Sequence, residues 1–196
     1  GFIVQTTDLQ TQDCGENVNA VYGPIQSTDL ITSSITVNNL VTLIKGSTND
    51  TTLRTYMFCM LYLMGNKTET TNRLQYKQNN LYGVIVDVAF PGGLKSKITK
   101  YRCLKTGENF TRPFATFDNL QDNINFVRDF YSQKMSTYFT DGLTKVQTVN
   151  KIIELFYNTW YTSGSLTETY TENSNYNTWL GNAGWAYQQA KTLGLY

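Results

Sequence analysis

The sequence predicts an α+β fold that is mostly helical, with a small antiparallel β-sheet after a central helix. Stretches with apolar residues at helical spacing occupy much of residues 35–64 and 119–193. Between them, residues 81–117 hold short alternating segments separated by turn residues. Helices, then a group of strands, then helices again are typical of α+β domains, because βαβ units would alternate one strand with one helix.

Residues 1–34 are interpreted as an N-terminal arm ahead of one domain at residues 35–196. The arm is polar and mixed in composition, and within it one short strand is expected at Phe2–Val4. Such an arm either packs on a neighbour or stays loose. The start at Gly1 lacks Met, so we expect a processed product or an excised piece.

Two helices are expected before the sheet. The first covers Ile35–Lys45, and Gly46 is expected to end it. The second covers Thr51–Met64, and Asn49–Asp50 is a good N-cap for it. Apolar residues lie on most sides of this second helix, which predicts that it is central and buried. Within it, Cys59 is expected to be a small core residue.

Three strands are expected after the central helix, at Leu81–Phe90, Lys97–Leu104 and Phe110–Phe117. β-Branched residues alternate along the first strand, and Pro91–Gly93 forms a strong turn after it. A second turn at Thr106–Asn109 separates the other two strands. Short strands joined by tight turns predict an antiparallel sheet.

Three further helices are expected in the last part of the chain, at Asn119–Met135, Lys145–Tyr161 and Tyr176–Leu193. Apolar residues recur in the first two at helical spacing. The last helix is expected to be interrupted near Gly181 and Gly184, because glycine weakens a helix interior.

Composition excludes several classes of function. The formal net charge is +1, from 16 basic and 15 acidic residues, so no broad electrostatic footprint for nucleic acid is present. The sequence has no His, which excludes Ser-His-Asp and Cys-His catalysis and disfavours a zinc site. The three cysteines are widely spaced and predict neither a metal pattern nor a disulfide framework. No segment reaches the roughly 18 consecutive apolar residues of a membrane span.

The segment Leu63–Thr71, which reads Leu-Met-Gly-Asn-Lys-Thr-Glu-Thr-Thr, carries a first resemblance. It resembles the Gly-Asn-Met-x-x-Glu-Ser-Thr segment of lysozyme domains in phage tail-tip lysins, members of the lysozyme-like superfamily. One residue would be missing between Asn66 and Glu69. In that family the Glu is the catalytic acid at the end of the buried helix, and the corresponding residue is Glu69.

The segments Asn79–Val84 and Phe114–Ile124 carry a second resemblance. The first is similar to the Asn-Asn-Leu-Phe-Gly-Ile motif of bacterial β-N-acetylglucosaminidases of the flagellar and autolysin type. The second is similar to their Phe-Arg-x-Tyr-Asp-Ser-x-Glu-Glu-Ser-Ile segment, with Phe117 in place of Tyr and Asn123 in place of Ser. By strict spacing the catalytic Glu of these enzymes would fall on Asn66, so Glu69 takes that role only with a shortened loop.

The resemblance implies Glu69 as general acid. Protonating the leaving oxygen of a glycosidic bond requires a carboxyl group whose pKa lies near the working pH, and partial burial raises it. The alternative is a surface Glu at a helix end. A second carboxylate would activate water or act as nucleophile, and Asp87 and Asp118 are the candidates. Asp118 is alternatively the N-cap of the helix from Asn119, and Asp87 lies either on a sheet face or in the cleft.

The candidate substrate-binding residues are Asn80, Tyr82, Gly83, Tyr101 and Phe117. Asn80 and Tyr82 would line the sugar cleft, and backbone amides near Gly83 would donate to N-acetyl carbonyls. Tyr101 would stack on a sugar ring or would be a core or partly buried residue, and Phe117 would face the acid across the cleft. The alternative for Tyr82 is a core aromatic residue at the entry of the strand.

The resemblance therefore implies a lysozyme-like peptidoglycan glycan-strand hydrolase that needs no cofactor. Its partners would be peptidoglycan glycan strands and other phage tail proteins, in the virion tail or outside the cell at the wall. The alternative is a catalytically silent lysozyme-like module that binds the cell wall or builds a phage particle, which the substitutions at Phe117 and Asn123 favour. A more distant alternative is a protein-binding domain whose N-terminal arm adds to a partner.

Overall fold

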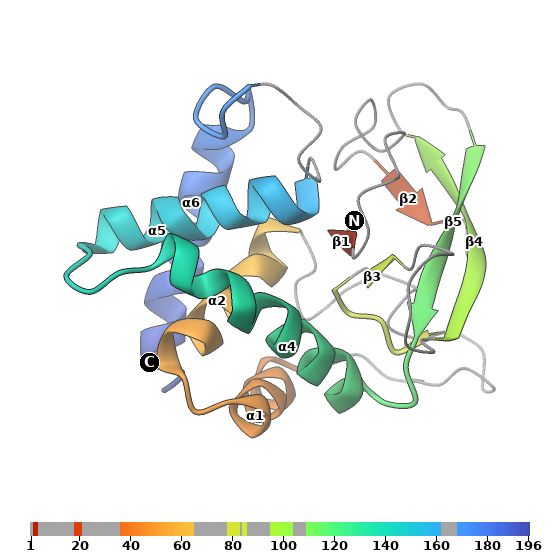
Figure 1. Ribbon diagram of the computed structural model, residues 1–196, viewed down its shortest axis with the longest axis horizontal. Coiled ribbons are helices and arrows are strands. Elements are labelled where there is room, and N and C mark those ends of the chain that lie inside the picture. The colour runs from red at the N-terminus through yellow and green to blue at the C-terminus, as the bar shows by residue number, and fades with distance from the viewer. Residues whose placement is uncertain are drawn as a thin grey trace.

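The helices gather on one side of the molecule and the strands on the other, and we call these parts the helical lobe and the sheet lobe (Figure 1). The computed structural model describes residues 2–3, 18–20, 36–64, 78–82, 84–85, 95–103, 109–161 and 168–196. Helices predominate, and the strands form one sheet. The predicted helix-rich architecture with a small sheet is thus confirmed at this level.

The sheet contains five strands among the described residues, in the spatial order β1-β3-β5-β4-β2. Their bounds are Phe2–Ile3 (β1), Val18–Ala20 (β2), Val84–Ile85 (β3), Lys95–Cys103 (β4) and Asn109–Thr116 (β5). β5 pairs antiparallel with both β3 and β4, as the sequence predicts. The start of the first predicted strand is wrong, because residues 81–82 form a bend ahead of β3.

The N-terminal arm supplies both edge strands of this sheet. β1 pairs in parallel with β3, and β2 pairs antiparallel with β4, so the sheet is mixed rather than wholly antiparallel. β1 also packs beside residues 157–161 of the helical lobe (Figure 1). The two described strands of the arm therefore pair with strands of the same chain, and β1 contacts both lobes.

Two helices precede the sheet, α1 at Val37–Ser47 and α2 at Thr51–Leu63. Thr36 caps α1, where its hydroxyl accepts a hydrogen bond from the backbone N–H of Asn39 at 3.1 Å. Asp50 caps α2 by accepting from two backbone N–H groups, which confirms the predicted N-cap. The expected end of the first helix is wrong, because Gly46 lies inside α1.

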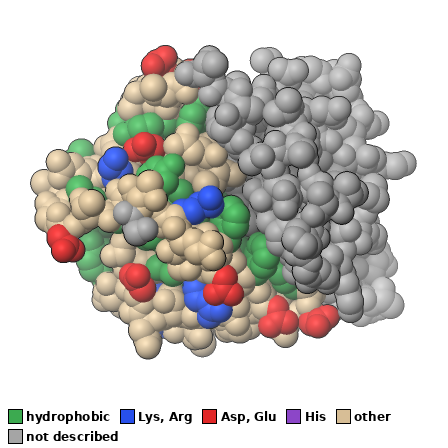
Figure 2. Space-filling view, in the orientation of Figure 1, with side chains coloured by type: hydrophobic (Ala, Val, Ile, Leu, Met, Phe, Trp, Pro, Cys, Tyr) green, Lys and Arg blue, Asp and Glu red, His purple; other side chains and the backbone are tan. Residues whose placement is uncertain are grey.

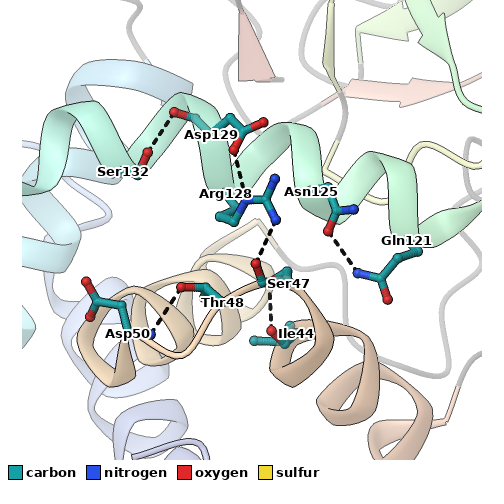
Figure 3. A network of polar contacts seen from close by, with 9 residues as sticks. All are labelled: Ile44, Ser47, Thr48, Asp50, Gln121, Asn125, Arg128, Asp129 and Ser132. Atoms are coloured by element: carbon teal, nitrogen blue, oxygen red, sulfur yellow. Dashed lines mark hydrogen bonds and ion pairs between the residues drawn. The ribbon is translucent and has the colours of Figure 1, made fainter.

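Arginines from two other helices bond to the C-terminal end of α1, and Figure 3 shows the one from α4 (Leu120–Tyr138), Arg128. Arg128 of α4 donates to the carbonyl oxygen of Ser47 at 2.7 Å, and Arg54 of α2 donates to that of Lys45 at 3.1 Å. The hydroxyl of Ser47 also turns back to the carbonyl oxygen of Ile44 at 2.6 Å. Because these donors satisfy carbonyl groups that a helix end leaves unpaired, α1 continues past its glycine.

Three α-helices follow the sheet: α4 at Leu120–Tyr138, α5 at Lys145–Phe156 and α6 at Tyr176–Thr192. α5 continues directly into a π-helical turn, η1, at Tyr157–Tyr161. A capping box at Thr144 starts α5. The predicted interruption of the last helix is wrong, because α6 runs without a break through both of its glycines.

The core surrounds α2, which packs against α1, α4, α5 and α6. Its residues from Tyr56 to Leu61 are completely buried, which confirms the predicted central helix. Cys59 is 0% exposed and faces α6, where its thiol lies 3.9 Å from the carbonyl oxygen of Ala183. The largest fully buried side chains are Trp179, Tyr56, Tyr82, Tyr131, Phe58 and Phe156.

Candidate functional site

The two segments that carry the second resemblance meet where β5 leads into α4. We call residues 78–82 and 115–123 the junction. The backbone N–H of Phe117 donates to the carbonyl oxygen of Gln78 at 2.9 Å, and the Asn79 side chain donates back to the carbonyl oxygen of Phe117 at 3.0 Å. Asn79 has a φ of 48°, in the left-handed region that Asn tolerates better than most residues. These hydrogen bonds thus join two segments that lie more than thirty residues apart in the sequence.

Asn80 is buried at the centre of the junction, with 0% of its surface exposed. Its amide nitrogen donates to the carbonyl oxygens of Val84 and Ala115, each at 2.9 Å. Its side-chain oxygen accepts from the backbone N–H of Val84 at 2.8 Å. Both polar ends of Asn80 are therefore occupied inside the protein, and the predicted placement of this side chain along an open cleft is wrong.

Tyr82 joins the junction to the central helix. Its hydroxyl donates to the carbonyl oxygen of Met57 at 2.7 Å, and its side chain is 0% exposed. Burial, and then the neighbouring Tyr131 and Cys59, raise the pKa of Tyr82 well above its ordinary value. Of the two roles that the sequence left open, the structure supports the core aromatic residue at the entry of the strand.

Asn123 of α4 fixes the same turn from the other side. Its side-chain oxygen accepts from the backbone N–H of Leu81 at 2.9 Å, and the residue is fully buried. Its amide nitrogen is a buried donor without a partner among the described residues. The sequence marked Asn123 as a departure from the family pattern but did not predict its contact with Leu81, which spans 42 residues of chain.

Phe117 and Asp118 lie together at the entry to α4. Phe117 is 5% exposed and packs on Phe126, with ring centroids 5.8 Å apart, so it faces the core rather than a cleft. Asp118 is exposed. The expected capping role of Asp118 is wrong, because Asn119 is the N-cap and accepts from the backbone N–H of Asp122 at 2.8 Å. Asp118 is therefore an exposed residue of the junction that does not cap α4.

The remaining candidates are less defined. Glu69, Asp87 and Gly83 lie outside the described residues. Tyr101 lies in β4, in register with Phe110 of β5 and Ala20 of β2. Of the eight candidates, the structure thus brings Asn80, Tyr82, Phe117 and Asp118 together at the junction.

Acidic and basic side chains are interspersed over the visible face of the helical lobe, without a large area of one sign (Figure 2). No group of three or more His, Cys, Asp or Glu residues that could hold a metal ion occurs in the part of the chain that the structure describes. Within the same ranges, no helix combines the length and the apolar character that crossing a membrane requires.

Comparison of the chain with protein-family models, with curated proteins and with solved structures found no match.

Proposed function

We propose that this protein is a lysozyme-like hydrolase of peptidoglycan glycan strands, with Glu69 as the general acid. The observation that carries the proposal is the junction itself. The two segments on which the sequence resemblance rests are hydrogen-bonded to each other through Asn80 and Ala115 and through Leu81 and Asn123. Tyr82 ties them to the central helix. The two segments that match the motifs of one enzyme family thus also contact each other in space. This contact supports the resemblance to that family.

The chain connectivity supports Glu69 as the acid. The central helix ends at Leu63, followed by its half-buried C-cap Met64, and the chain enters the junction at the buried Gln78. Glu69 belongs to the segment between these two anchors. A carboxyl group held beside apolar walls has a raised pKa, which keeps it protonated for donation to the leaving oxygen.

Asp118 or Asp87 would supply the second carboxylate. In glycoside hydrolysis this group either activates a water molecule or attacks the sugar as a nucleophile. Asp118 is an exposed residue of the junction, which supports it as a candidate for such a role. We assign the enzyme to a phage tail or to the cell wall, with peptidoglycan and other tail proteins as partners, because of its resemblance to tail-tip lysins.

The test is clearing of purified peptidoglycan by the wild-type chain and by single variants. Glu69→Gln is expected to lower the clearing rate by about 100-fold or more, because general acid catalysis contributes that much. Asp118→Asn and Asp87→Asn identify the second carboxylate. Glu172→Gln, which changes an exposed carboxylate on the loop before α6, is the matched control and should clear at the wild-type rate. Clearing that survives Glu69→Gln in a folded protein would contradict the assignment of the acid.

A second candidate function is favoured by a specific observation. Three residues expected to hold the sugar, Asn80, Tyr82 and Phe117, are buried and used by the fold. This burial favours a silent lysozyme-like module that binds the wall or builds a particle. A folded wild-type chain that sediments with peptidoglycan sacculi but never clears them would support this candidate over the hydrolase.

A further inference from the structure

A pocket of about 220 Å³ opens at the N-terminal end of α2. That end of α2 lies near the C-terminus of the chain (Figure 1). Its floor is formed by Thr55, Ile152 and Tyr187, which are all nearly completely buried. Its rim comes from α2, from the turn between α4 and α5, and from the last residue of the chain. A buried floor with an exposed rim is the shape of a site that a small ligand can enter.

The rim presents polar groups that have no bonding partner in the part of the chain that the structure describes. The Asp141 carboxylate and the Thr52 and Thr140 hydroxyls make no hydrogen bond or ion pair within the described ranges, and all three residues are exposed. Gly142, with a φ of 81°, holds the turn that carries Asp141 and Thr140. This backbone conformation favours glycine, so Gly142 is required for the turn that carries Asp141.

Aromatic rings complete the pocket wall. Tyr187 and Tyr196 meet edge to face with ring centroids 5.3 Å apart, and their hydroxyls are hydrogen-bonded to each other. Lys191 lies over the Tyr196 ring, 4.8 Å from its centroid, which steadies that exposed ring. Phe139 adds a third ring to the lining.

We propose that this pocket binds a single neutral sugar ring. Hydroxyl groups of a pyranose both donate and accept, which matches an acceptor carboxylate beside threonine hydroxyls. The apolar faces of the sugar match the tyrosine and phenylalanine rings. The volume lies below the range of about 300–1,000 Å³ of pockets for drug-sized ligands, which suits one ring.

The pocket is separate from the proposed hydrolytic site. None of the residues that line the pocket belongs to the junction. Sugar binding at the pocket is therefore a claim beyond the proposed hydrolysis, and it is tested separately. In particular, Glu69→Gln should leave sugar binding at the pocket unchanged.

The test is a titration of the ¹⁵N-labelled full chain with N-acetylglucosamine, followed through backbone amide shifts. We expect saturable shifts at Thr140, Asp141 and Gly142. Asp141→Ala and Tyr196→Ala should each weaken the affinity by about tenfold or more, as the loss of a charge-assisted hydrogen bond or a stacked ring does. Both residues are exposed, so neither variant should unfold the protein. Asp129→Ala, which removes an exposed carboxylate from α4, is the matched control and should bind as the wild type does.

Three results would overturn the inference. One is the absence of saturable shifts at the turn between α4 and α5. Another is saturation that neither Asp141→Ala nor Tyr196→Ala weakens. The third is saturation by methylammonium without saturation by the sugar, which would assign the pocket to a cation held by Asp141.

Discussion

At the residue scale, Asn80 shows how one amide can fasten a strand, a turn and a second segment together. It bonds to Val84 through both its oxygen and its nitrogen, and to Ala115 of β5 through its nitrogen. Because the group is fully buried, no water is available to replace a lost partner. The identity of the side chain, not only its size, is therefore required.

Asn80→Asp should lower the free energy of unfolding by about 3 kcal/mol or more, because a charged acceptor would face two carbonyl oxygens in a buried site. Urea unfolding measures this change. Asn125→Asp is the matched control, since the Asn125 side-chain oxygen already acts as an acceptor for Gln121 at 3.0 Å and would keep that role. Its effect should stay within about 0.5 kcal/mol. Equal effects of the two substitutions would contradict the structural role of Asn80.

Local sequence signals predicted some residue roles and missed others for a physical reason. Asp50 was predicted as a cap because the bonds that it accepts come from residues two and three positions away. The role of Tyr82 depended on whether α2 covers it, and Met57 lies 25 residues away. Phe117 was expected at a cleft, and its burial likewise depends on its packing against Phe126. Distant packing of this kind leaves no mark in a local pattern.

At the element scale, the glycines of α6 lie in a conformation that accepts a side chain, whereas the glycine in the turn before α5 does not. A Cβ atom added at Gly181 or at Gly184 would meet open space, and both positions are helical. Gly142 has equally free space, but its φ of 81° is one that side chains rarely adopt. The sequence could not separate these cases, because the neighbours of a glycine do not reveal its φ.

Gly181→Ala should raise the free energy of unfolding by about 0.5–1 kcal/mol, since alanine loses less chain entropy in a helix. Gly142→Ala should lower it by about 1–2 kcal/mol, since it forces a side chain into the left-handed region. Thermal unfolding of the two variants beside the wild type measures both. The account of α6 as an unbroken helix would be wrong if Gly181→Ala were the more destabilising substitution.

The ends of helices and the edges of the sheet also depend on distant contacts that local sequence does not predict. Gly46 was expected to end α1, but Arg128 and Arg54 arrive from other helices and satisfy the last carbonyl groups. β1 and β2 pair with strands that follow them by more than 80 residues. Helix positions in the described regions could be predicted because their apolar spacing is local, whereas these partners could not.

At the scale of the whole molecule, buried tyrosines link stability to alkaline pH. Burial raises the pKa values of Tyr56, Tyr82 and Tyr131 above the ordinary value of about 10. Below that pH these tyrosines are neutral in the folded and the unfolded protein, so their ionisation does not reduce the free energy of unfolding. As the pH rises above about 10, the unfolded chain loses tyrosine protons while the folded chain keeps them, so stability falls.

Each such tyrosine should contribute a slope of about 1.4 kcal/mol per pH unit to this loss. Tyr82→Phe removes one of them, and should therefore lower stability at neutral pH by about 1 kcal/mol while making the alkaline decline shallower. Urea unfolding between pH about 9 and about 11 compares the two proteins. Parallel declines would show that Tyr82 ionises as readily in the folded protein as in the unfolded chain.

The two lobes, with the junction between them, frame the proposed cleavage of a glycan, and the most direct test of that claim is chemical. It measures new reducing sugar ends released from purified peptidoglycan by the folded wild-type chain, beside Glu69→Gln. The account predicts reducing ends that accumulate with time for the wild type and are nearly absent for the variant. Intact glycan strands after prolonged incubation with the folded wild type, or the release of free amino groups in place of reducing ends, would contradict it.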